Sequence, residues 1–157
     1  MHVDKPKARA TAASKEKDRI AAELEDILSS IVDAINTRDF NPAAYPWTCM
    51  DENYRMIAAG AACVAKNKTE FLDGFRDYTS AHPSVRSEIV SMDTHVYAAS
   101  GYAEIYVNVQ NSGGPDVPLE LKQMTVGVQE FRCVEGGKWF TVGQTTIMGL
   151  KDEFVAG

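Results

Sequence analysis

The fold of this chain is decided by a stretch in its last third, residues 119–149, which read LELKQMTVGVQEFRCVEGGKWFTVGQTTIMG. β-Branched and aromatic residues, which are typical of strands, recur in both Leu119 to Cys133 and Lys138 to Gly149. Gly136-Gly137 between them supplies the backbone freedom that a tight reversal needs. The stretch therefore predicts two long antiparallel strands joined by a hairpin turn, and we expect the rest of the chain to build toward this sheet.

Two further strands are predicted before this hairpin. Apolar and polar residues alternate after Pro83, and again before a reversal at residues 111–115 (NSGGP). This period of two is typical of a half-buried strand. The later strand carries apolar side chains on one face and larger polar ones on the other: Ala103, Ile105, Val107 and Val109 against Tyr102, Glu104, Tyr106 and Asn108. Strands with two differently occupied faces predict a curved antiparallel sheet.

A long amphipathic helix is predicted near the N-terminus. From about Ser14 an apolar residue recurs every three or four positions, which places one stripe on a single helix face: Ile20, Leu24, Ile27, Leu28, Ile31 and Ile35. Asn41-Pro42 disfavours continuation, so the helix should end between Asn36 and Asp39. The stripe must cover an apolar surface.

A second helix and a short hairpin are predicted between the long helix and the strands. Asn67 precedes Glu70 by three residues, which is the spacing of a capping box, and apolar residues follow at helical intervals to about Ser80. Tyr54 to Ala59 and Ala61 to Ala65 are predicted to form two short strands. Helices gathered before a sheet predict an α+β fold rather than a parallel βαβ array.

The length of 157 residues and an apolar content of 45% predict one domain with its own core. We assign that domain to residues 15–151, with a flexible basic tail over residues 1–14 and a C-terminal tail over residues 152–157. Through Arg19 the chain holds six basic residues against three acidic ones. A solvated tail and a segment that binds an anionic partner are both compatible with this composition.

The overall charge and the cysteine pattern argue against several classes of protein. A net charge of −6 disfavours a nucleic-acid surface, which needs clustered Lys and Arg. No window approaches the ~18 consecutive apolar residues of a membrane span, and no apolar signal segment follows the basic N-terminal residues. Cys49, Cys63 and Cys133 form no metal-binding motif, so reduced thiols, no metal and a cytoplasmic location are predicted.

Taken in order, these segments resemble the nuclear transport factor 2-like superfamily, in particular its SnoaL-like polyketide cyclase and scytalone dehydratase branch. The resemblance covers roughly Ser14 to Leu150. It is carried by the long helix, the Trp47 loop with its hairpin, the helix opened by KNKTEF (residues 66–71) and the closing hairpin EFRCVEGGKWFTVGQTTI (residues 130–147). It implies a conical α+β barrel, in which a strongly curved sheet wraps around the N-terminal helix and leaves a mostly apolar cavity. It also implies a homodimer, since many members pair through the outer face of the sheet.

Two residues are candidates for proton-transfer catalysis. The ketosteroid isomerase branch has its basic Asp where the first short strand begins, and this resemblance implies such a role for Asp51; a local hydrogen-bonding role is the alternative. His95 lies in a predicted strand, where an imidazole facing the cavity could act as a base near neutral pH. The scytalone dehydratase branch uses a pair of strand histidines, and His95 has no such companion in this sequence, so an ordinary sheet or turn histidine is its alternative.

A larger set of residues is predicted to line a pocket for a small hydrophobic, oxygenated molecule. Aromatic and sulfur-bearing side chains suit a ring-bearing ligand, although those at helical spacing equally suit a plain core: Trp47, Tyr54, Met56, Phe71, Phe75, Tyr78 and Tyr106. Neutral polar contacts would come from one strand face if it points inward: Gln123, Thr125, Gln129 and Thr145. Outward-facing positions would instead form cross-strand ion pairs: Glu104, Glu120, Lys122, Glu130 and Arg132. The alternation alone leaves open which face points inward.

These observations support two functions. The sequence has no Gly-rich phosphate loop, HExxH or GxSxG motif, so any chemistry is expected to need no cofactor. One function is a cofactor-independent cyclase, isomerase or dehydratase that transfers a proton on its substrate. The other is a non-catalytic ligand-binding or dimerisation module of the same fold. A buried carboxylate or His within the cavity would separate the two.

Overall fold

The computed structural model describes residues 5–58, 63–115 and 121–148. Within these ranges the elements follow in the order α1 (Lys5–Asn36), β1 (Met50–Ala58), β2 (Cys63–Ala65), α2 (Lys68–Ala81), β3 (Arg86–Tyr97), β4 (Tyr102–Ser112), β5 (Gln123–Cys133) and β6 (Trp139–Met148). Single turns of 3-10 helix precede β1 and follow β3: η1 (Trp47–Cys49) and η2 (Ala98–Ser100). The predicted strand residues Leu119, Glu120 and Gly149 lie outside the described residues.

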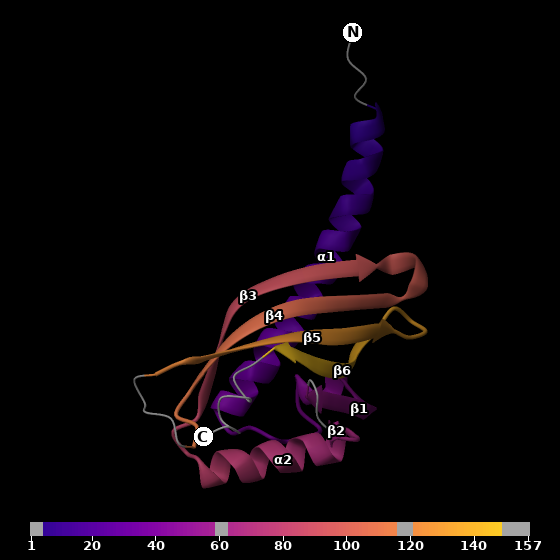
Figure 1. The fold of residues 1–157 in the computed structure, drawn as a ribbon. Coiled ribbons are helices and arrows are strands. Elements are labelled where there is room, and N and C mark those ends of the chain that lie inside the picture. Colours follow the sequence, from indigo (N-terminus) through magenta and orange to yellow (C-terminus); the bar gives the residue numbers. More distant parts are fainter. Residues whose placement is uncertain (1–4, 59–62, 116–120, 149–157) are drawn as a thin grey trace.

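The strands form one open sheet in the order β2-β1-β6-β5-β4-β3. The predicted β1–β2 hairpin is present, and β3 to β6 pair antiparallel as expected. β1 runs parallel to β6, so the sheet is mixed where the sequence predicts an antiparallel one. Figure 1 shows the sheet curving across α1, with α2 along the edge that holds β1 and β2. The predicted α+β architecture, a curved sheet around an N-terminal helix, is confirmed.

α1 packs against the sheet through its apolar stripe. The stripe residues are buried, with exposed fractions of 5% or less: Ile20, Leu24, Ile27, Leu28 and Ile31. The helix begins at Lys5, so it continues through residues for which the sequence predicts a flexible tail. The side chains from Ala12 to Arg19 are all exposed, and this part of α1 projects beyond the sheet (Figure 1).

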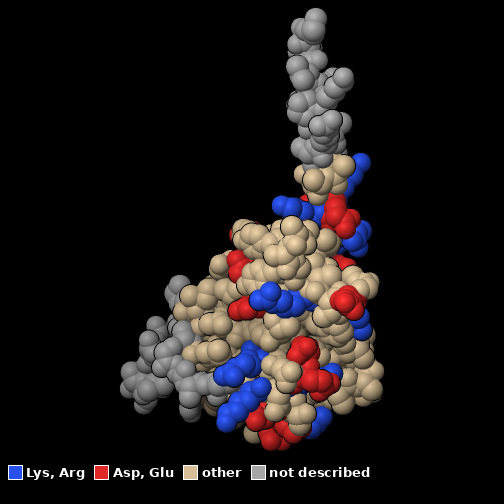
Figure 2. Space-filling model, turned by 90° about the vertical axis from the view of Figure 1, so that its right-hand side faces the viewer, with Lys and Arg blue, Asp and Glu red and all other residues tan. Residues whose placement is uncertain are grey.

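Charges of both signs surround α1 where it leaves the body of the molecule, as Figure 2 shows. Arg19 lies 2.8 Å from the carboxylate of Glu16 and 3.8 Å from that of Glu23. Neighbouring acids thus balance the positive charge of this residue on the exposed part of the helix. Neither α1 nor α2 has the apolar run that crossing a membrane would take.

The C-terminal end of α1 is tied to the beginning of β3. Arg38 adopts a positive φ of 61°, and the Asp39 N–H donates to the Ala34 carbonyl at 2.8 Å, which is the pattern of a Schellman cap. The Arg38 guanidinium then donates to the Val85 carbonyl at 2.8 Å. Asn36 makes two bonds with the backbone of Ser87, one to its carbonyl at 2.7 Å and one from its N–H at 2.9 Å. The helix end and the edge strand are therefore held as one unit.

α2 begins at the predicted cap. The Asn67 side chain accepts a hydrogen bond from the Glu70 N–H at 2.8 Å, and the Glu70 carboxylate accepts one from the Lys66 N–H at 3.1 Å. Phe71 is buried and its ring lies 6.0 Å from that of Trp47. The cap and the aromatic contact fix where α2 starts and which of its faces meets η1.

Candidate functional site

A cavity of about 210 Å³ lies between the concave face of the sheet and the two helices. Most of its wall is apolar and comes from α1, α2, β1 and β4: Leu28, Ile31, Val32, Ile35, Tyr54, Met56, Phe71, Phe75, Val107 and Val109. The rest is neutral and polar, and comes mainly from the strands: Ser87, Asn111, Thr125, Gln129, Gln144 and Thr146. The space can therefore hold an apolar molecule and offer it hydrogen bonds without a charge.

The structure shows which face of the strands points into the cavity, a question that the sequence alone leaves open. On β5, Thr125 and Gln129 point into the cavity, whereas Glu130 lies on the other face, opposite Glu104 of β4. The pairing of β5 with β6 shifts register between Glu130 and Phe131, so that Gln144 lies opposite Gln129 and Thr145 lies opposite Val128 on the other face. A Cβ on Gly127 would meet the Gln144 amide nitrogen at 3.3 Å, so this glycine makes room for the Gln144 side chain.

A buried hydrogen-bond network sets the direction of one donor at the cavity wall. The Thr141 hydroxyl donates to the Glu130 carbonyl at 2.9 Å, so it can only accept from Gln129, whose amide nitrogen lies 2.7 Å away. That nitrogen donates its second hydrogen to the Tyr54 oxygen at 3.0 Å. Because Tyr54 accepts in this bond, its own O–H hydrogen is left to donate to another acceptor, and Tyr54 is one of the residues that line the cavity.

Tyr54 is held as a neutral phenol. The side chain is 1% exposed, and burial raises its pKa well above the ordinary value, while the bond from Gln129 lowers it by less. The ring also packs edge-on against Phe71, with centroids 5.1 Å apart. Tyr54 is therefore a fixed hydrogen-bond donor that keeps its proton at physiological pH.

A second polar chain lies along the strands of the same cavity. The Ser87 hydroxyl donates to the Asn111 side-chain oxygen at 2.7 Å, and the Asn111 amide donates to the Thr125 hydroxyl at 3.0 Å. Asn36 holds the Ser87 backbone from the side of α1. These groups satisfy one another, so this part of the wall is polar and rigid rather than open for a charged ligand.

The two predicted catalytic residues lie away from the cavity. Asp51, near the start of β1, accepts a hydrogen bond from the Asn53 N–H at 2.8 Å, which is the local role weighed for it from the sequence. His95 is paired with Asp93 at 3.1 Å and packs edge-on against the ring of Tyr106, on the outer side of the sheet. Strand alternation explains this, because the next residue, Val96, is the one that faces the core.

The structure brings together only part of the predicted ligand-binding set. Six members line the cavity: Tyr54, Met56, Phe71, Phe75, Thr125 and Gln129. Trp47 is 0% exposed and belongs to the core, with its indole N–H bonded to the Asp39 carbonyl at 2.7 Å. Tyr106 and Thr145 both lie opposite Val128, on the outer face. Gln123 lies at the beginning of β5, outside the cavity lining.

Polar cavity residues that were not singled out are Ser87, Asn111, Gln144 and Thr146. The sequence predicts a strand position for Ser87 and a turn position for Asn111. Simple alternation along β6 from the hairpin turn would place Thr145 on the cavity face. The register shift between Glu130 and Phe131 places Gln144 and Thr146 there instead. Only knowledge of the pairing would have shown that.

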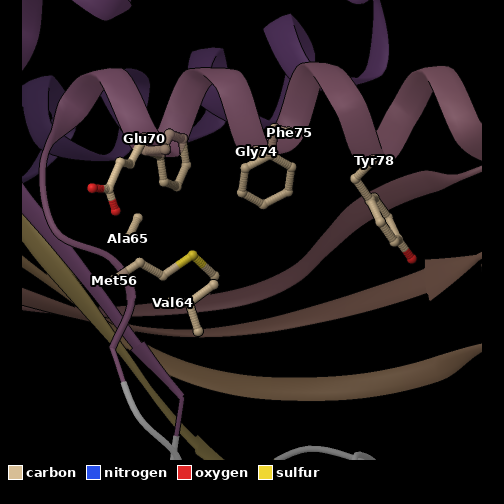
Figure 3. A pocket seen from close by; sticks show the side chains of 8 residues that line it. Met56, Val64, Ala65, Glu70, Gly74, Phe75 and Tyr78 are labelled. Carbon is tan, nitrogen blue, oxygen red and sulfur yellow. The ribbon is translucent and has the colours of Figure 1, made fainter.

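A surface groove of about 320 Å³ lies beside the cavity, between α2 and the β1–β2 hairpin. Figure 3 shows Phe75 extending from α2 above Met56 and Val64, with Tyr78 farther along the helix. Tyr78, predicted to bind the ligand, lies here and not in the cavity. The groove thus presents a second apolar space on the same side of the molecule.

Comparison with known proteins gives a fold and no closer relationship. No protein-family model and no curated protein sequence matches the chain. A nuclear transport factor 2-like protein of unknown function from Pseudomonas putida superimposes with a TM-score of 0.65 at 14% identity, over 82% of this chain and 86% of that one. One with a cystatin-like fold from Novosphingobium aromaticivorans gives 0.63 at 13%, over 92% and 90%. A candidate ketosteroid isomerase from Shewanella frigidimarina gives 0.60 at 11%, over 77% and 91%.

These likenesses agree with the arrangement of helices, sheet and cavity described above. The SnoaL-like branch suggested by the sequence is not distinguished by them. The chain has the nuclear transport factor 2-like fold.

Proposed function

We propose that this protein binds a small, neutral, largely apolar molecule that carries an oxygen acceptor such as a carbonyl. The observation that carries this proposal is the Tyr54 hydroxyl, which accepts from Gln129 and so keeps its own hydrogen to donate at the wall of a mostly apolar space. A buried donor of this kind favours binding of a ligand that has an acceptor, because a buried polar group without a partner costs free energy.

The size of the cavity limits the ligand. An engineered protein cavity of about 150 Å³ accommodates benzene, so the 210 Å³ found here suits a single ring or a chain of similar size. Phe71 and Phe75 provide ring edges and faces against which such a group packs. A monocyclic ketone is therefore a suitable probe.

Binding is better supported than proton-transfer catalysis. Among the residues that the structure describes, the cavity wall contains amides, hydroxyls and apolar groups and neither a carboxylate nor an imidazole. A proton transfer next to a carbonyl needs a general base as well as a donor to the oxyanion. Tyr54 fits only the second role, so the non-catalytic alternative becomes the leading one.

The proposal is tested by comparing acetophenone with ethylbenzene, which has the same shape but lacks the carbonyl. We expect the wild-type protein to prefer acetophenone by about 2- to 12-fold, the value of one net hydrogen bond. Tyr54→Phe should abolish this preference, and Tyr106→Phe, on the outer face, should leave it unchanged. Titration calorimetry measures both affinities. Equal binding of the two probes by the wild type would overturn the proposal.

The enzymatic alternative is checked with the same ketone. Exchange of the acetophenone methyl protons in D₂O reports abstraction of a proton next to the carbonyl. We expect the same exchange rate with the wild type and with Tyr54→Phe. Exchange that the wild type accelerates and the variant does not would restore an isomerase-like chemistry to this cavity.

We also propose that two copies of the chain pair through the outer face of the sheet. This face carries exposed apolar side chains, with Tyr97 49%, Tyr106 39% and Met124 38% exposed. Glu104 and Glu130 lie directly opposite each other on it, and a cation supplied by a second copy would reduce their repulsion.

A further inference from the structure

The groove beside the cavity shares part of the cavity wall. Met56, Phe71 and Phe75 line both spaces. From these shared walls we propose that cavity and groove are two halves of one site. It would bind an elongated molecule with an oxygen-bearing head at Tyr54 and a slender, unbranched apolar tail along α2. This proposal rests on the binding function proposed above and extends it to a class of ligand.

The shared wall contains one fixed and one adaptable part. Phe71 is 4% exposed and is held by ring contacts with Tyr54 at 5.1 Å, Phe75 at 4.8 Å and Trp47 at 6.0 Å. Met56 has an unbranched side chain with three rotatable bonds, and its thioether points along the groove below Phe75 (Figure 3). A tail would therefore pass beside Met56, with Phe71 as the unmoving side.

Gly74 keeps the groove open at its centre. It lies inside α2, where glycine is a poor helix former, and it lines the groove. A Cβ built at this position has nothing within 4 Å, so any larger side chain would occupy groove space rather than fill a gap in the core. Gly74 thus lowers the helix propensity of α2 at the position where a bound tail would cross it.

The groove chemistry favours an alkyl tail over a peptide. Carbon and sulfur atoms of Met56, Val64, Ala65 and Phe75 form the middle of the wall, and the Glu70 carboxylate at one end is engaged by the Lys66 N–H at 3.1 Å. A bound peptide would bury backbone N–H and C=O groups that need partners, and the side chains along the middle of this wall are apolar. A methylene chain has no such requirement.

The experiment measures affinity against chain length for the straight-chain ketones from 2-hexanone to 2-dodecanone. In the wild type, each added methylene should strengthen binding by up to ~4-fold, and the gain should continue past the length that fills the cavity. Gly74→Leu should end the gain at a shorter chain than in the wild type, because its side chain would occupy the groove. Gly74→Ala, which restores helix propensity with a single methyl group, is the matched control and should resemble the wild type.

The outcomes separate this inference from the function on which it rests. Circular dichroism checks that Gly74→Leu and Gly74→Ala are folded. If the gain then ends at the same chain length in the wild type and in Gly74→Leu, the groove does not hold the tail. That result would leave the Tyr54-dependent preference for acetophenone intact. If the preference fails while Gly74→Leu still shortens the series, the head group assigned to Tyr54 is wrong and the groove assignment stands.

Discussion

Arg38 illustrates how a single side chain joins distant segments of this molecule. Its guanidinium donates to carbonyl groups in α1 and in the turn before β3, including Pro83 at 2.9 Å and Val85 at 2.8 Å. Its backbone has a φ of 61°, a conformation more often occupied by glycine. The side-chain bonds and the backbone conformation therefore act in opposite directions on stability.

Substitution of Arg38 separates these two effects. Arg38→Ala should lower the free energy of unfolding by about 1–3 kcal/mol, because the guanidinium bonds are lost and the positive φ is kept. Arg38→Gly should recover about 1 kcal/mol of that loss, since glycine adopts this φ without strain. Urea denaturation of the two variants measures both values. An Ala variant as stable as the wild type would show that the guanidinium bonds contribute nothing.

At the level of single residues, the sequence predicts the apolar wall of the site better than its polar groups. Tyr54, Met56, Phe71 and Phe75 were recognised because a large apolar side chain in a short strand or on a helix stripe is directed inward. Asp51 and His95 have side chains suited to proton transfer, but neither reaches the cavity. Asp51 is held by a local hydrogen bond from Asn53, and strand alternation turns His95 outward beside Asp93. Residue type alone says little about orientation.

Among the elements, α2 depends on its first turn. The Asn67 side chain accepts from the Glu70 N–H, an amide that would otherwise have no partner within the helix. Asn67→Ala should therefore destabilise the protein by about 1 kcal/mol, as measured by the midpoint of urea unfolding. Asn53→Ala, an exposed residue of β1, is the control. An equal effect of the two substitutions would contradict a specific role for the cap.

The elements that were predicted well are those with a local signal. The end of α1 and both ends of α2 follow from an apolar period and from a cap or proline nearby in sequence. The parallel pairing of β1 with β6 joins residues far apart in the chain, and no local pattern specifies it. The register shift between Glu130 and Phe131 likewise has no local signal, and it turns Thr145, predicted to line the pocket, to the other face of the sheet.

At the scale of the whole molecule, pairing through the outer face of the sheet is directly measurable. We expect a dimer by sedimentation velocity at tens of micromolar, which requires an association free energy of at least about 7 kcal/mol. Tyr106→Glu adds a negative charge beside Glu104 and should weaken association at least ~10-fold. Val64→Glu, on exposed β2, should not. A wild-type monomer at these concentrations would refute the paired arrangement.

The bonds between Asn36 and Ser87 have a consequence for the solubility of the folded chain. β3 is an edge strand, and an edge normally presents free N–H and C=O groups to which a strand of another molecule can be added. At Ser87 both groups are already occupied by the amide of Asn36. A side chain from α1 thus takes the place of a seventh strand, so that intermolecular sheet growth is blocked where β3 begins.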